Sequence, residues 1–209
     1  LEPDSVTIYQ MELPFNTLYS KQIREGGKPV PVADWETKRE WTGYAFSEFE
    51  RAGYVVSSAY TLVRDPQQTR FIYRDSLWDG ADMIATGVAS FGHVDGVHYQ
   101  NADGMENYME SLARKELPLA RALTAKPRER LIRELILLLT LGHLDAGRFR
   151  KKFDTDILSE FKAPFEKLRD CGYLTMEENG VRLTREGLMR ADGLLPEFFE
   201  PEHRNIRFT

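Results

Sequence analysis

Cysteine is the scarcest chemically informative residue in this chain, with Cys171 its one example among 209 residues. A single thiol forms no disulfide framework within the chain, which is typical of a protein in a reducing compartment such as the cytoplasm. Iron–sulfur clusters are held by several cysteine thiolates, so this chain alone does not supply the ligands of such a cluster. From the sequence we assign no metal ligand and no catalytic residue to this chain.

Long apolar stretches and an excess of basic residues are absent as well. No apolar run approaches the roughly 18 residues that a membrane-spanning helix requires, and the polar, acidic N-terminus is unlike a signal peptide. The 28 basic and 33 acidic residues give a formal net charge of −5, which argues against a nucleic-acid-binding surface. With 42% hydrophobic residues, the composition is that of a soluble globular protein. We expect a cytoplasmic monomer and, because the chain begins at Leu1 close to an expected strand, a piece of a longer protein.

The first expected strand spans Ser5 to Leu13. Its apolar character is continuous, which is typical of a strand buried on both faces of a parallel sheet. Ligands of barrels and open α/β sheets bind at the carboxyl ends of such strands. Gln10, Met11 and Glu12 are therefore candidate ligand-contacting residues. The alternative is that Glu12 is a solvated residue at a strand end.

The glycine-rich stretch from Ala85 to Asn101 is the most distinctive part of the sequence. Glycine within a strand pattern is entropically costly and marks a bulge or a close approach of a ligand or of another part of the chain. Three glycines interrupt the stretch: Gly87, Gly92 and Gly96. His93 and His98 are either ligand-contacting residues or ordinary hydrogen-bonding loop histidines. The stretch is thus either a ligand-contacting strand end or a glycine-kinked edge strand with its loop.

The segments around these two stretches mix helix and strand patterns. Asp34 is an expected helix N-cap, and apolar residues at helical spacing predict a helix that Gly53 ends. We expect the aromatic residues of this helix, Trp41 among them, to face the core. The other expected elements are a loop at 19–32, a strand at 54–63, a turn at 64–68, a helix at 105–115 and a connector at 117–123.

From Pro127 onward the sequence predicts helices, a hairpin and a last helix. The expected helices span 128–141, 145–153 and 156–171, and the last one follows Thr184. Asn179-Gly180 predicts a type I′ turn, which needs a positive φ at both central residues. This order resembles a winged helix, which raises the alternative of a non-enzymatic nucleic-acid-binding or interaction module. The third helix carries both charges, and Glu177-Glu178 makes the hairpin tip acidic, which opposes contact with phosphates.

Four segments, by their order and spacing, resemble the HemN-like radical S-adenosylmethionine (SAM) enzymes, the family of oxygen-independent coproporphyrinogen oxidase. They are TIYQMELPFNTLY at 7–19, Arg74-Asp75 with Trp78, GVASFGHVDGVHYQN at 87–101, and Gly172-Tyr173-Leu174 with 181–187. The sequence departs from the family's pattern at Ala85, where glycine is usual, and at Asp75, which replaces asparagine. It also lacks the acidic residue that is usual near 56–59.

The resemblance implies an α/β plus α fold. Residues 1–122 would hold the last strand or strands of a partial (β/α)6 barrel with an added small sheet, and residues 123–209 a winged-helix-like helical domain. A [4Fe–4S] cluster would be held by a C-x3-C-x2-C motif upstream of Leu1. The implied SAM-binding residues are Gln10, Met11, Glu12, Gly87, Val88 and Phe91, and the implied substrate-binding residues are Arg74, Trp78, His93 and His98.

The implied activity is the reductive cleavage of SAM to a 5′-deoxyadenosyl radical that acts on a tetrapyrrole, with an electron donor such as flavodoxin. Arg74 would pair with a substrate propionate; the alternative is an ion pair with a neighbouring aspartate. Relatives differ in outcome, from oxidative decarboxylation of coproporphyrinogen to methyl transfer, haem insertion and haem-ring opening. The forms of the family motifs at 7–19 and 87–101 favour the haem-utilisation branch of the family. The sequence does not show which of these reactions the enzyme would catalyse.

Overall fold

The computed structural model describes residues 1–13, 17–26 and 32–204, and the chain divides into two compact units. Unit 1 comprises Leu1–Arg70 with Leu139–Thr209, and unit 2 comprises Phe71–Leu138. The domain boundary expected from the sequence, between residues 122 and 123, falls inside unit 2. The compact units do not test the predicted sequence domains, so the division into residues 1–122 and 123–209 stays a prediction.

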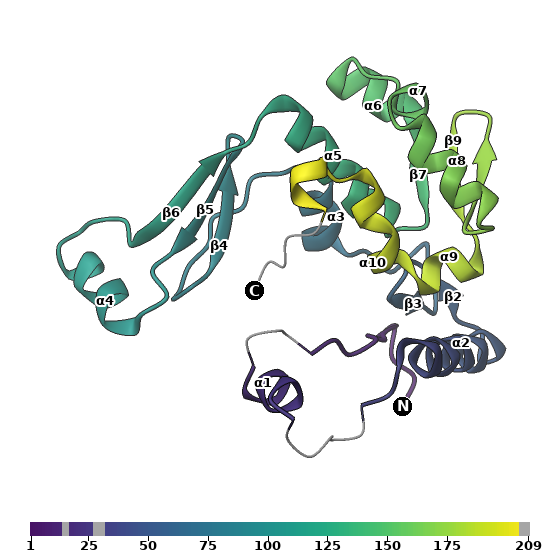
Figure 1. Cartoon of the computed structure of the whole chain (residues 1–209), viewed down its shortest axis with the longest axis horizontal. Helices are drawn as coiled ribbons and strands as arrows, with labels where there is room; N and C mark the ends of the chain where they lie inside the picture. The colour runs from purple at the N-terminus through teal and green to yellow at the C-terminus, as the bar shows by residue number, and fades with distance from the viewer. Residues whose placement is uncertain (14–16, 27–31, 205–209) are drawn as a thin grey trace. The chain divides into compact units, whose positions relative to one another are not determined.

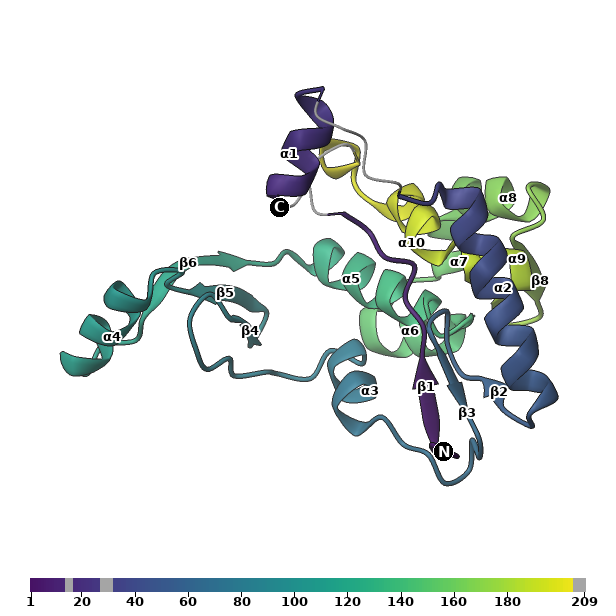
Figure 2. The same ribbon diagram turned by 90° about the horizontal axis from the view of Figure 1, so that it is seen from below.

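The first sheet of unit 1 has three short strands in the spatial order β1 (Ser5–Thr7), β3 (Thr61–Val63) and β2 (Val55–Val56) (Figure 2). Both pairings are antiparallel. The expected long strand of a parallel sheet is therefore wrong in length and direction, because the chain leaves the ladder after Thr7. The strand expected at 54–63 is likewise two strands, joined by a tight loop.

Helix α2 (Trp35–Arg51) packs on this sheet through the fully buried Phe46. Phe46 belongs to one cluster with Tyr54 and Leu62, and Val6 and Phe49 pack around them. The predicted cap is confirmed, since the Asp34 carboxylate accepts the Thr37 N–H at 2.8 Å.

The expectation that all aromatic residues of α2 face the core is wrong for one of them. The side chain of Trp41 is 61% exposed. Gly53, at φ +89°, follows the end of the helix as predicted.

The expected loop at 19–32 contains a helix. Helix α1 (Leu18–Arg24) begins after Thr17, whose hydroxyl accepts the Ser20 N–H at 3.2 Å. The sequence signal for a loop came mainly from glycines and prolines at 26–31. Of these, positions 27–31 lie outside the described residues, as does Pro14 of the resemblance segment.

The second sheet of unit 1 is antiparallel, with the order β7 (His143–Asp145), β9 (Gly180–Leu183) and β8 (Leu174–Glu177). The helix expected at 145–153 is confirmed as α6 (Ala146–Phe153), capped by Asp145. The helix expected at 156–171 is two helices, α7 (Ile157–Glu160) and α8 (Lys162–Asp170). Pro164 has no N–H to donate to the Glu160 carbonyl, which explains the break.

The C-terminal part of unit 1 continues from the predicted Thr184 cap, whose hydroxyl accepts the Gly187 N–H at 3.1 Å. The expected single helix is several short ones. They are α9 (Arg185–Met189), α10 (Ala191–Leu194) and two 3₁₀ helices, η1 (Leu195–Phe198) and η2 (Pro201–His203).

The turn between β8 and β9 differs from the sequence prediction. Glu177 pairs with Gly180, so the central residues are Glu178 and Asn179, and neither Asn179 nor Gly180 has a positive φ. Gly180 is required for another reason. A Cβ at this position would lie 1.9 Å from the Leu144 carbonyl oxygen of β7.

Unit 2 contains α3 (Ile72–Trp78), α4 (Met105–Ala113), most of α5 (Pro127–Leu139) and the antiparallel sheet β4 (Phe91–Val94), β5 (Val97–Asn101) and β6 (Leu119–Thr124) (Figure 1). The helices at α4 and α5 are predicted from the sequence and confirmed. The expected connector at 117–123 is wrong, because β6 pairs with β5. A type I′ turn does occur here, at Asp95 (φ +48°) and Gly96 (φ +76°). Within the described parts of the chain, no helix is long and apolar enough to cross a membrane.

Replacing Gly180 with alanine tests the close contact between β9 and β7. We expect Gly180→Ala to lower the free energy of unfolding by roughly 1–3 kcal/mol, because the new methyl group must push the two backbones apart. Gly193→Ala is the matched control, since Gly193 lies in α10 with no atom within 4 Å of its Cβ position. Urea denaturation measures both, and equal stability of the two variants would contradict the prediction.

Candidate functional site

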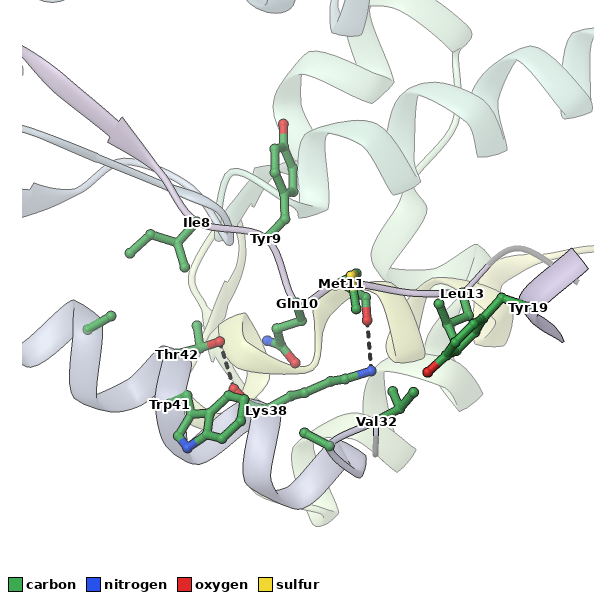
Figure 3. A pocket seen from close by; sticks show the side chains of 12 residues that line it. Ile8, Tyr9, Gln10, Met11, Leu13, Tyr19, Val32, Lys38, Trp41 and Thr42 are labelled. Carbon is green, nitrogen blue, oxygen red and sulfur yellow. Dashed lines mark hydrogen bonds between the residues drawn. The ribbon is translucent and has the colours of Figure 1, made fainter. Parts of the chain in front are cut away.

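An open cavity of about 610 Å³ lies in unit 1 beside the chain segment that follows β1 (Figure 3). That segment, α1 and one face of α2 supply its walls. The described lining residues are Ile8, Tyr9, Gln10, Met11, Leu13, Tyr19, Val32, Ala33, Lys38, Trp41, Thr42 and Ala45. Two of the three residues predicted at the strand end, Gln10 and Met11, therefore line a cavity.

Two hydrogen bonds hold this segment in place. The Lys38 Nζ donates to the Met11 carbonyl oxygen at 2.7 Å, and the Gln10 Nε2 donates to the Met189 carbonyl oxygen at 2.8 Å (Figure 3 shows the first). The Gln10 amide is thus already used within unit 1. The Met11 side chain, 61% exposed, is free to meet a ligand.

Glu12 lines a different cavity of unit 1, of about 300 Å³, together with Trp35, Arg39 and Tyr60. The Tyr60 hydroxyl donates to the Asp192 carboxylate. Burial and this carboxylate raise the pKa of Tyr60 far above its ordinary value, so the phenol stays protonated. The segment from Tyr9 to Glu12 therefore separates an apolar cavity from a more polar one.

The glycine-rich stretch in unit 2 begins with a loop, 85–90, that side chains from the following elements hold. The Asn101 amide, 3% exposed, donates to the carbonyl oxygens of Ala85 and Gly87 at 3.3 and 3.0 Å. The hydroxyls of Tyr99 and Tyr108 accept the N–H groups of Ala85 and Gly87 at 2.8 and 2.9 Å. Asn101 lies at a bulge, where the register between β5 and β6 shifts.

Gly92 shows why this part of the chain needs a residue without a side chain. The Tyr99 ring lies over it, and a Cβ at Gly92 would come within 2.2 Å of that ring. The close approach predicted from the glycine pattern is real. The approaching group is a tyrosine of the neighbouring strand, which reaches across Gly92 to hold Ala85.

The loop itself is backbone-strained at one residue. Ala89 has φ +59°, a left-handed conformation that favours glycine. Val88 beside it is half-buried, and Phe91, which follows the loop, is 61% exposed. Strained backbone of this kind occurs often at ligand-binding sites, although it does not identify the ligand.

His93 and His98 face each other across the hairpin. They are directly paired in the β4–β5 register, and their ring centroids lie 4.4 Å apart. His93 is buried and His98 half-buried. Burial and then the nearby Arg133 lower the pKa of His93, while burial and then His93 itself lower that of His98. Both imidazoles are therefore biased toward their neutral forms.

Arg74 lies between two aromatic rings. Its guanidinium is 4.2 Å from the Phe71 ring centroid and 5.3 Å from that of Trp78, and it forms an ion pair with Asp75 at 2.7 Å. The ion pair is the alternative that the sequence left open. The buried Nη1 atom makes no hydrogen bond among the described residues, so one edge of the guanidinium has no partner there.

The predicted cofactor residues belong to both units: Gln10, Met11 and Glu12 to unit 1, and Gly87, Val88 and Phe91 to unit 2. That they contact one ligand stays a prediction. Sequence reasoning missed Lys38, which supports Met11, and Tyr99 and Tyr108, which support the loop. The sequence signal that could have identified the two tyrosines is their position within and shortly after the glycine-rich stretch. Among the described residues, no group of three potential metal ligands of the His, Cys, Asp or Glu type comes together.

Ala89→Gly tests the backbone strain in the loop. Glycine adopts the left-handed conformation without a steric penalty, so we expect the free energy of unfolding to rise by about 0.5–1 kcal/mol. Ala122→Gly, in the exposed strand β6 of the same unit, is the control and should lower stability by about 0.5–1 kcal/mol. A loss of stability in both variants would show that Ala89 is not strained.

The histidine pair makes stability depend on pH. Since both pKa values are lowered on folding, the unfolded chain binds more protons below its ordinary histidine pKa of about 6.5, and stability falls as the pH decreases from there. His98→Gln removes one of these groups, so the loss between pH 7.5 and pH 5.5, measured in urea, should be smaller than in the wild type. If His98→Gln lost as much stability as the wild type between these pH values, the lowered pKa of His98 would be contradicted.

Comparison with known proteins gives a match to a family model and a match to a solved structure. Residues 125–190 match the family model described as the HemN C-terminal domain. The solved structure of coproporphyrinogen III oxidase (HemN) from Escherichia coli, described as a radical SAM enzyme, matches with a TM-score of 0.70 at 15% sequence identity.

The structural match covers 94% of this chain and 48% of the E. coli chain, so this chain spans about half the length of that protein. No curated protein matches the sequence. The resemblance seen in the sequence is confirmed at this level: residues 125–190 match the model of the HemN C-terminal domain, and over most of its length the chain has a fold similar to part of HemN.

Proposed function

We propose that this chain is the C-terminal part of a radical SAM enzyme that acts on a tetrapyrrole, either coproporphyrinogen or haem. The observation that carries the proposal is the position of Gln10 and Met11. These two residues of the resemblance segment line a cavity in a chain whose fold is similar to part of HemN. An enzyme that degrades haem or transfers a methyl group is an alternative within the same family.

The described residues do not fit an iron–sulfur cluster. Cys171 is exposed and is the only cysteine of the sequence, and such clusters need several thiolates. In the proposal, the [4Fe–4S] cluster and its cysteines belong to a preceding part of a longer protein, and we derive no step through them. The part played by this chain is to bind and orient SAM and substrate and to exclude water.

Two groups of residues in this chain suit contact with SAM. Lys38 fixes the Met11 carbonyl and leaves the Met11 side chain exposed to the cavity. The loop at 85–90, held by Asn101, would present its main chain near Gly87 and Val88, and the exposed Phe91 would cover the ligand. Glu12 would act as a hydrogen-bond acceptor from the second cavity.

Four residues of unit 2 are proposed to contact the substrate. Arg74 is held by Phe71 and Trp78 with one nitrogen unpartnered, which suits an incoming carboxylate. A tetrapyrrole carries several propionates, and the Trp78 ring would contact its apolar surface. His93 and His98, biased toward the neutral form, retain the lone pairs that a ligand to iron or a hydrogen-bond acceptor needs.

Residues 127–189 follow the order α5, β7, α6, α7, α8, β8, β9 and α9, and this order is similar to that of a winged helix. We propose a winged-helix-like domain that completes the enzyme. A non-enzymatic interaction module is the candidate from another class, and the same element order favours it. The acidic hairpin tip at Glu177-Glu178 argues against nucleic acid as its partner. A cytoplasmic monomer that receives electrons from a donor such as flavodoxin completes the proposal.

The test of the proposed activity uses the longer protein, reconstituted anaerobically with iron and sulfide. With dithionite and SAM, we expect 5′-deoxyadenosine to form, and to form faster when either haem or coproporphyrinogen is added. The tetrapyrrole that accelerates it identifies the substrate. A reading frame with no upstream C-x3-C-x2-C motif, or no 5′-deoxyadenosine under these conditions, would favour the interaction module.

Met11→Glu and Phe91→Glu test the two proposed SAM contacts in that protein. Because both side chains are exposed, the variants should fold, and replacing an apolar contact with a carboxylate that must be desolvated should weaken SAM binding by about tenfold or more. Met176→Glu, at an exposed position of β8, is the control and should bind SAM as the wild type does. Unchanged affinity in a folded Met11 or Phe91 variant would remove that residue from the site.

A further inference from the structure

The segment from Tyr9 to Glu12 follows β1 but lies outside its ladder, so contacts other than strand pairing decide its position. β1 ends at Thr7, and the next residue still bonds to the neighbouring strand connection, because the Ile8 N–H donates to the Tyr60 carbonyl at 2.7 Å. Beyond Ile8 the chain turns away from the sheet (Figure 2). Side chains from other elements must therefore hold the segment that the proposed function assigns to SAM.

Tyr60 contacts the start of this segment with its side chain as well. Its ring centroid lies 5.7 Å from that of Tyr9, with the two rings tilted by 37°. The Tyr9 side chain is 74% exposed, so the Tyr60 ring is one of few groups that can support it. The main chain around Tyr60 is fixed by two bonds, from the Ala59 N–H to the Thr140 carbonyl at 2.8 Å and from the Tyr60 N–H to the Ser58 hydroxyl at 3.2 Å.

The hydroxyl group of Tyr60 fixes the direction of its ring. It donates to the Asp192 carboxylate of α10, a residue 132 positions further along the chain. A hydrogen bond to an ionised acceptor is stronger than one between neutral groups, and the raised pKa of Tyr60 keeps the donor protonated at neutral pH. Asp192 is itself a fixed acceptor, because Ala191 and Leu194 of the same helix are buried.

The C-terminal helices reach the segment at a second point. The Gln10 Nε2 donates to the Met189 carbonyl oxygen at the end of α9. Helices α9 and α10 thus hold two consecutive residues, Gln10 directly and Tyr9 through Tyr60. Met11, which follows them, is the residue whose side chain the proposed function places against SAM.

We propose that Tyr60 and Asp192 are positioning residues, whose hydrogen bond holds the segment from Tyr9 to Glu12 in the conformation that receives SAM. The proposal rests on the proposed function and adds to it a role for α10, which supports the cofactor site from the C-terminal part of the chain. Both residues act through Tyr9. Without their bond the segment would sample other conformations, and the apparent affinity for SAM would fall by the fraction of time spent in them. Once SAM is bound the complex is the same, so the rate at saturation is retained.

The first experiment measures 5′-deoxyadenosine formation by the longer protein as a function of SAM concentration. Tyr60→Phe and Asp192→Ala should each raise the KM for SAM by about three- to tenfold and leave kcat within about twofold of the wild type. The double variant should be no weaker than either single one, because both remove the same bond. Asp192→Asn keeps an acceptor oxygen and should restore most of the affinity. Tyr44→Phe, which removes the hydroxyl of an exposed tyrosine of α2, is the matched control and should behave as the wild type.

The second experiment measures the segment itself, by nitrogen-15 relaxation of the 209-residue chain without SAM. We expect main-chain order parameters above about 0.8 for residues 9–12 in the wild type and below about 0.6 in Tyr60→Phe. The order parameter of Leu62, in the central strand β3, should be unchanged. Equal values for residues 9–12 in the two proteins would overturn the proposal, as would an equal loss of order at Leu62, which would show general loosening.

The two experiments separate this proposal from the proposed function. A lower kcat at unchanged KM in Tyr60→Phe would indicate a smaller fraction of folded enzyme and would overturn the positioning role, as would additive effects in the double variant. If the wild-type longer protein formed no 5′-deoxyadenosine, the proposed function would fail. The relaxation measurement would still decide whether Tyr60 and Asp192 hold the segment.

Discussion

The packing of Phe46 against Leu62 fixes helix α2 on the first sheet of unit 1 and so determines the position of the other side chains of α2. Phe46 is fully buried between α2 and the β1–β3–β2 sheet, so it fixes the helix across the strands. Lys38 lies two helical turns before Phe46 on the same helix, and that spacing brings its ammonium to the segment that leaves β1. The apolar core thus places a charge beside a cavity, and the hydrogen bond to Met11 depends on a contact between hydrophobic residues.

In unit 2, polar side chains rather than a hydrophobic contact hold the segment of the candidate site in place. At the start of the loop at 85–90, Tyr99 and Tyr108 accept the N–H groups of Ala85 and Gly87, and Asn101 donates to the carbonyls of the same two residues. Buried main-chain groups without such partners would be costly. These three side chains therefore hold the start of the loop, whereas the left-handed Ala89 is held by the Ala102 carbonyl and the Gln100 amide. Both candidate sites combine a main-chain segment without regular structure with side chains from a rigid neighbour.

Features that depend on neighbouring residues in the sequence were predictable here, and features that depend on distant partners were not. The caps at Asp34 and Thr184, the stop at Gly53 and the helices α4, α5 and α6 follow from local patterns and are confirmed. The antiparallel direction of β1 and the existence of β6 depend on pairing with strands far along the chain. The glycine at 180 looked like a turn residue, whereas the Leu144 carbonyl is what requires it. For the site, Gln10 and Met11 were predicted from a strand end, whereas β1 ends at Thr7, so their position beside a cavity did not follow from the pattern that selected them. Lys38 and Trp41 were not predicted, because helical periodicity assigns an aromatic residue to the core unless the opposite wall is known.

The bulge near Asn101 has a consequence for the outer strand of its sheet. All six residues of β6 are exposed, and within the described sheet β6 is an edge, so one side of its main chain is open to pairing with another chain. A bulge interrupts the regular spacing of the ladder and increases the local twist, and Arg121 places a charged group in the middle of the strand, bonded to Gln100. An irregular, charged edge is a poor template for a flat intermolecular sheet. The irregularity beside Asn101, next to the loop that it holds, thereby also disfavours regular pairing of β6 with a strand of another chain.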